Sequence, residues 1–137
     1  MCKNVEITNN TDANIDHRMF QTVYEAVKNG ENLQKDKTID LIFCKSDAMQ
    51  SINKKYRGAD KPTDVLSFAC DFAESISWGE IIIDVETAEM QRCDKTLNRE
   101  LQELFLHGFL HILGYDHIKT KDKDVMTHKE NKYLQAL

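Results

Sequence analysis

The sequence lacks a long apolar run, and this absence excludes a membrane-spanning helix. Crossing a bilayer takes about 20 consecutive apolar residues, and no stretch of the 137 residues approaches that length. The first residues, Met-Cys-Lys-Asn-Val-Glu, also lack the apolar segment of a secretory signal peptide. Together these absences predict a cytoplasmic protein with no membrane attachment.

Paired cysteines are missing as well. The four cysteines are widely scattered and form no Cys-x-x-Cys pair; they are Cys2, Cys44, Cys70 and Cys93. In a chain with no export signal, this pattern is typical of reduced thiols rather than of a disulfide framework or a cysteine-rich zinc site. We therefore expect all four thiols to be free.

The chain has no excess of positive charge, since its formal net charge is −5. Proteins that bind nucleic acid through their overall field are usually basic. An RNA-binding function would therefore depend on a local patch. The best candidate cluster is Lys54, Lys55, Arg57 and Lys61, which could equally be the solvated end of a helix.

Length and patterning predict one α+β domain over residues 1–137, because no repeat, low-complexity tract or linker interrupts the chain. Apolar periodicity predicts strands at 3–8, 38–44, 65–68 and 80–84, and helices at 15–28, 47–56, 85–93, 99–113 and 124–135. Asn14 and Ser46 are the expected N-caps of the first two helices. Without strict alternation of strands and helices, we expect a small mixed four-stranded sheet packed against the fourth helix.

Three histidines gather in that fourth helix and the turn after it. His107 and His111 are four residues apart, which places both on one helix face about 6 Å apart along the axis. Gly114 can take the positive φ that ends a helix, so the turn can bring His117 back toward the other two rings. Three imidazoles with an open fourth position are the ligand set of catalytic zinc. The sequence therefore predicts one Zn²⁺ bound by His107, His111 and His117.

The spacing His-x3-His-x2-Gly-x2-His is the one found in the long zinc-peptidase motif. Those peptidases carry a Glu after the first His as general base, whereas this chain has Gly108. A peptidase would need a carboxylate from elsewhere, and Glu80 is the only strand candidate. A zinc peptidase-like hydrolase is therefore kept as an alternative.

Two stretches together resemble the YbeY-type rRNA-maturation endoribonucleases. Residues 107–117 read His-Gly-Phe-Leu-His-Ile-Leu-Gly-Tyr-Asp-His, and residues 56–68 contain Tyr-Arg-Gly followed by Asp-Lys-Pro-Thr-Asp-Val-Leu-Ser-Phe. The strand start Gly-Glu-Ile at 79–81 also fits, so the likeness runs from about residue 38 to residue 117. One departure is Ala-Cys after residue 68, where a Pro is common in the family.

The resemblance implies a cytosolic bacterial enzyme with one zinc ion on the three histidines. It implies a single-strand-specific, metal-dependent endoribonuclease that acts in 16S rRNA 3′-end maturation and ribosome quality control. Its partners would be rRNA precursors and ribosomal particles. The Arg at the position of Arg57 is treated as functionally important in this family.

The chemistry of an RNA hydrolase suggests roles for two further residues. Zinc lowers the pKa of its bound water toward about 7, and Arg57 is our candidate to bind the phosphate oxygens as charge develops. Asp116 could orient a metal-bound imidazole or accept a proton, or it could only cap the turn. Asp60 and Asp64 are expected to shape the loop before the third strand.

A non-enzymatic alternative is also open: a zinc-containing ribosome-assembly factor. Structural zinc is closed by four protein ligands. A fourth protein ligand, such as a cysteine, would favour that class over an enzyme.

Overall fold

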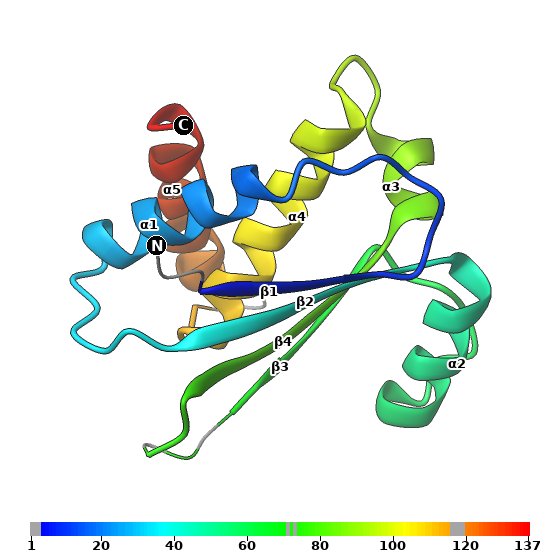
Figure 1. Cartoon of the computed structure of the whole chain (residues 1–137), viewed down its shortest axis with the longest axis horizontal. Helices are drawn as coiled ribbons and strands as arrows, with labels where there is room; N and C mark the ends of the chain where they lie inside the picture. Colours follow the sequence, from blue (N-terminus) through cyan, green and yellow to red (C-terminus); the bar gives the residue numbers. More distant parts are fainter. Residues whose placement is uncertain (1–3, 71, 73, 116–119) are drawn as a thin grey trace.

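Four strands form one mixed sheet in the computed structural model, which describes residues 4–70, 72, 74–115 and 120–137 (Figure 1). The strands are β1 (Val5–Asn9), β2 (Thr38–Cys44), β3 (Val65–Ala69) and β4 (Ser77–Asp84). Their order is β1-β2-β4-β3; the β1–β2 and β2–β4 pairs are parallel, and β3 is antiparallel to β4. The small mixed sheet expected from the sequence is confirmed, and β3 is one of its edges.

Five helices surround this sheet. They are α1 (Arg18–Gly30), α2 (Ser46–Arg57), α3 (Val85–Gln91), α4 (Leu97–Ile112) and α5 (Thr120–Gln135). Helices α1, α4 and α5 gather on one side of the sheet, and α2 lies on the other side (Figure 1). We call these sides the α4 face and the α2 face. All predicted helices are present with shifted ends, and no helix of the described residues is long and apolar enough to cross a membrane.

Both predicted N-caps are wrong. Helix α1 begins at Arg18, three residues later than expected, with His17 at its N-cap. Ile15 is buried in the core before the helix begins. Helix α2 has Lys45 at its N-cap, and Ser46 is the first helical residue. The Ser46 hydroxyl donates to Asp84 Oδ2 at 2.7 Å, so a contact with the end of β4 replaces the local cap.

Alternating side chains of the strands supply a core on each face. Ile81 and Ile83 of β4 join the larger core under α1 and α4, whereas Ile82 joins a smaller cluster with Met49 of α2. On the α4 face, Phe105 of α4 meets Phe20 of α1 edge to face, with ring centroids 5.6 Å apart. This packing fixes α4 against β3 and β4, as the sequence predicted for the helix that carries the histidines.

Candidate functional site

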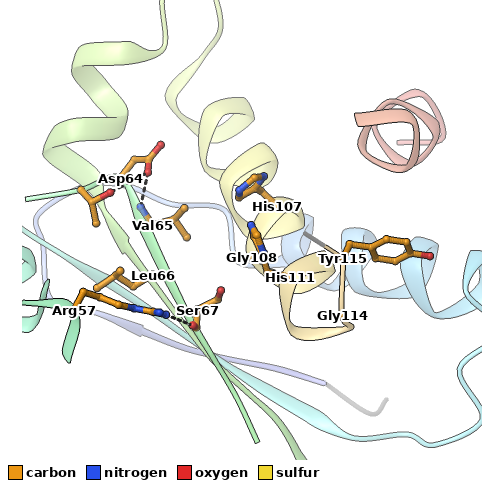
Figure 2. Close-up of a pocket in the computed structure, with 11 residues that line it drawn as sticks. Arg57, Asp64, Val65, Leu66, Ser67, His107, Gly108, His111, Gly114 and Tyr115 are labelled. Carbon is orange, nitrogen blue, oxygen red and sulfur yellow. Dashed lines mark hydrogen bonds between the residues drawn. The ribbon is translucent and has the colours of Figure 1, made fainter. Parts of the chain in front are cut away.

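His107 and His111 lie one turn apart on α4 and meet edge to face. Their ring centroids are 4.7 Å apart, with an interplanar angle of 76°. Both are half-buried and line a cavity of about 570 Å³. The prediction that the two imidazoles share one helix face is therefore confirmed (Figure 2).

The cavity lies between α4 and the edge strand β3. Its helical side consists of the two histidines with Gly108 between them, and its strand side is formed by residues 65–67. Thr63, Asp64 and Arg57 complete the strand side, while Gly114 and Tyr115 lie at the end of α4. The site therefore combines residues that are about 40 to 50 positions apart in the sequence.

Helix α4 ends as the sequence predicted. Its last helical residue is Ile112, and Gly114 follows with φ +108°, a conformation that favours glycine. The predicted third ligand, His117, and the candidate Asp116 lie outside the described residues, so both stay predictions. Among residues 4–70, 72, 74–115 and 120–137, no group of three His, Cys, Asp or Glu side chains is placed to hold a metal ion.

Two observations show that the described part of the site fits a metal. Neighbouring imidazoles at the wall of a cavity are a suitable donor pair for zinc. His107 Nδ1 lies 3.4 Å from Glu130 Oε1 of α5, and histidines that bind metal commonly place their second nitrogen against a carboxylate. In that arrangement His107 Nε2 would be the nitrogen left for a metal. Sequence reasoning missed Glu130, because only the packing of α5 brings it near α4.

Gly108 lacks the carboxylate base of a peptidase and lets α4 pack closely on β4. A Cβ at this position would lie 3.1 Å from Cγ2 of the fully buried Ile81, so a larger side chain would require Ile81 to shift. Glu80, the other candidate base, pairs with Phe68 and shares the orientation of Ile82, which puts it on the exposed α2 face. The prediction that Glu80 could serve the site is therefore wrong.

Arg57 reaches the strand side of the cavity from the last turn of α2. Its Nη2 donates to the backbone oxygen of Ser67 at 3.1 Å, and its guanidinium carbon lies 5.2 Å from the centre of the Phe68 ring. Figure 2 shows the side chain reaching toward Ser67 of β3, across the cavity from the two histidines. A guanidinium carries five N–H donors, so this one hydrogen bond leaves others for a ligand.

Asp64 is the only carboxylate among the described residues that line this cavity. Its Oδ1 accepts from the Val65 backbone at 2.8 Å, and its Oδ2 accepts from Gln91 Nε2 at 3.0 Å. Gln91 also donates to the buried Glu100, at 2.8 Å. Asp64 therefore shapes the start of β3, as expected, but it also faces the site, which its loop position in the sequence did not reveal.

Tyr115 ties the end of α4 to two other helices. Its hydroxyl donates to Glu31 Oε1, and Tyr133 and Lys129 of α5 donate to Glu31 Oε2, the latter at 3.0 Å. Burial raises the pKa of Glu31, but the hydrogen bonds from Tyr115, Tyr133 and Lys129 outweigh it and leave the pKa lowered. The Tyr115 ring points away from the histidines (Figure 2). This network holds Tyr115, two residues before the predicted ligand His117.

The described cysteines are free thiols, as the sequence predicted, and none of them lines the cavity. Cys44 is buried on the α2 face, Cys70 is half-buried and Cys93 is exposed. Burial, together with the nearby carboxylates Asp84 and Asp47, raises the pKa of the Cys44 thiol to about 11. None of these three thiols is placed to close a structural zinc site beside His107 and His111.

Comparisons with known proteins cover nearly the whole chain. The family described as "Endoribonuclease YbeY" matches residues 3–137. A protein of that name from Acholeplasma laidlawii is 40% identical over 114 residues, which cover 81% of this chain and 82% of that protein. One from Desulforamulus reducens is 36% identical over 130 residues, which cover 88% and 85%. The solution structure of TM1509 from Thermotoga maritima is similar with a TM-score of 0.65 and 26% identity, covering 96% of this chain and 87% of that one.

Proposed function

Because this chain belongs to the endoribonuclease YbeY family, as its two motifs suggested, we propose that it is an endoribonuclease. Its substrate is single-stranded RNA, cleaved in the cavity between α4 and β3. Within the cell, we propose that it acts in the cytoplasm on rRNA precursors in ribosomal particles. There it takes part in 16S rRNA 3′-end maturation and ribosome quality control, with residues 1–137 acting as one hydrolase domain.

The proposed cofactor is one zinc ion held by His107, His111 and His117. Support comes from the two imidazoles 4.7 Å apart and from the carboxylate of Glu130 behind one of them. When bound, the ion supplies an activated water and polarises a phosphoryl oxygen. Gly108 also lines the cavity and contributes no side chain to it.

The placement of Arg57 opposite the histidines is the observation that carries this proposal. Phosphodiester hydrolysis builds negative charge on the phosphate oxygens, and a guanidinium can bind two of them at once. The hydrogen bond to Ser67 and the contact with Phe68 hold the Arg57 guanidinium at the cavity before substrate arrives. Arg57 therefore stabilises the transition state without a large rearrangement.

The two alternatives from the sequence are less well supported. The carboxylate that zinc peptidases carry after the first histidine is absent, because residue 108 is glycine, and the candidate Glu80 faces the other side of the sheet. A ribosome-assembly factor with structural zinc needs a fourth protein ligand. The three described cysteines, which were the suggested source of that ligand, lie away from the cavity.

Zinc-loaded protein should be incubated with labelled single-stranded RNA, with duplex RNA and with casein. We expect cleavage of the single strand only. His107→Ala and His111→Ala should lose both zinc, measured by metal analysis, and cleavage. Arg57→Lys should keep zinc but cleave about 100-fold more slowly, because an ammonium lacks the paired donors of a guanidinium.

Arg18→Ala is the matched control, since the Arg18 side chain is 93% exposed on α1 and should not affect cleavage. Casein hydrolysis with intact RNA would overturn the proposal in favour of a peptidase. Unchanged cleavage by Arg57→Lys would remove Arg57 from the mechanism.

A further inference from the structure

An aromatic pair lies on the α2 face, on the other side of β3 from the cavity. Tyr56, in the last turn of α2, is 58% exposed and meets Phe68 of β3 edge to face, with ring centroids 5.5 Å apart and an interplanar angle of 64°. Phe68 packs on the buried cluster around Met49, which holds its ring in place, while the Tyr56 ring is open to solvent. Exposed aromatic rings are common on proteins, and exposure alone assigns no ligand.

The charges around this pair are arranged unevenly. Lys55 Nζ lies 5.1 Å from the centre of the Tyr56 ring. The guanidinium carbon of Arg57 lies 5.2 Å from the centre of the Phe68 ring. On the opposite side, Glu80 of β4 stands beside Phe68 on the same face. A polyanionic backbone is therefore attracted to the α2 side of the pair and repelled from the β4 side, although the whole chain has a net charge of −5.

Arg57 connects the aromatic pair to the cavity. Its guanidinium contacts the Phe68 ring, donates to Ser67 on the free edge of β3, and lines the cavity with the histidines. A phosphate bound by Arg57 therefore has the aromatic pair on one side and the two histidines on the other. The attached base of the same nucleotide or of its neighbour is then close to the exposed Tyr56 ring.

We propose that Tyr56 and Phe68 form a stacking subsite for an unpaired nucleobase of RNA, next to the phosphate bound by Arg57. The inference rests on the proposed endoribonuclease function and names the feature of the substrate that the enzyme reads. Aromatic rings beside cationic side chains bind single strands through base stacking and phosphate contacts. A duplex keeps its bases stacked on one another, so the subsite favours single-stranded RNA without reading its sequence.

The test compares two variants. Tyr56→Leu keeps an apolar side chain over Phe68 but loses the aromatic ring, whereas Tyr56→Phe keeps the aromatic ring. Zinc-loaded protein should be titrated into fluorescein-labelled single-stranded RNA, first intact and then with an abasic site at each position in turn. We expect Tyr56→Leu to bind intact RNA about 10-fold more weakly and to raise KM with kcat nearly unchanged. Tyr56→Phe should match the wild type.

The abasic series makes the test specific. Wild-type protein should lose affinity at one abasic position, and Tyr56→Leu should show no further loss at that position, because the same contact has already been removed. Melting temperatures of both variants should equal that of the wild type, which excludes damage to α2. Equal RNA affinity of Tyr56→Leu and wild type, or a loss that is the same at every abasic position, would overturn the subsite.

The two proposals fail separately. If the wild type cleaves RNA and Tyr56→Leu binds and cleaves equally well, the subsite is wrong and the nuclease stands. If the wild type shows the position-dependent binding but metal-loaded protein cleaves nothing, the nuclease is wrong and the subsite stands.

Discussion

Replacing Gly108 with Ala tests the close packing of α4 on β4. Two effects of opposite sign compete. Alanine in a helix interior is about 1 kcal/mol more favourable than glycine. The new Cβ, however, would lie 3.1, 3.2 and 3.3 Å from Cγ2, Cδ1 and Cγ1 of Ile81, which is tighter than ordinary van der Waals contact. Overpacking of this kind costs about 1–3 kcal/mol.

The surroundings of Ile81 decide which effect wins. Ile81 is fully buried, and its strand is paired on both sides, with Leu41 of β2 and Ser67 of β3. It cannot move away without disturbing the centre of the sheet. Subtracting the helix gain of about 1 kcal/mol from the overpacking cost of about 1–3 kcal/mol leaves a net loss of about 0–2 kcal/mol. Because Ile81 cannot move, we expect Gly108→Ala to lie in the upper half of this range, at about 1–2 kcal/mol less stable than the wild type. For a domain of this size the melting temperature should fall by roughly 3–8 °C.

Thermal and urea unfolding, followed by circular dichroism, measure this change. Ile81→Val, which removes the Cδ1 contact, serves as the partner in a double-mutant cycle. The double variant should be more stable than the sum of the two single changes predicts, by at least about 0.5 kcal/mol. A Gly108→Ala protein about 1 kcal/mol more stable than the wild type would refute the reasoning, because helix propensity would then act alone and the contact with Ile81 would cost nothing.

Two further substitutions and one labelling experiment probe the surrounding structure. Glu130→Ala should weaken zinc binding about 10-fold in a chelator competition, because His107 loses the carboxylate behind its ring; equal affinity would separate Glu130 from the metal site. Glu31→Gln should lower the free energy of unfolding at pH 7 by about 1–3 kcal/mol, since it removes a partner of buried donors. The lowered pKa of Glu31 contributes stability that is present above its unfolded value of 4.5 and lost as the pH falls through the folded value, so the variant should lose less stability on acidification; parallel pH curves would contradict this. In thiol labelling at pH 8, Cys93 should react at once and Cys44 only on unfolding, because the Cys44 pKa is about 11 and the thiol is buried; fast labelling of Cys44 in the native state would contradict its placement.

Much of the fold could be predicted from the sequence, because helix and strand periodicity are local properties. Strand β2 has the predicted bounds, and α4 carries His107 and His111 on one face before a glycine with positive φ. The element bounds were predicted less well, and both expected N-caps were wrong. Ser46 has the chemistry of an N-cap, but Asp84 at the end of β4 takes its hydroxyl, and no local rule anticipates a contact between residues 38 positions apart.

The sequence by itself determined the spacing of His107 and His111, since four residues make about one helical turn wherever the helix lies. It also determined the family, which two motifs predicted and the comparisons confirm. Only the tertiary structure decided what surrounds this part of α4. Arg57 lies across the cavity from the histidines, Glu130 lies beside His107, and Ile81 packs against Gly108. The physical reason is that the helix period sets distances within one element, whereas contacts between elements depend on how their apolar faces pack together.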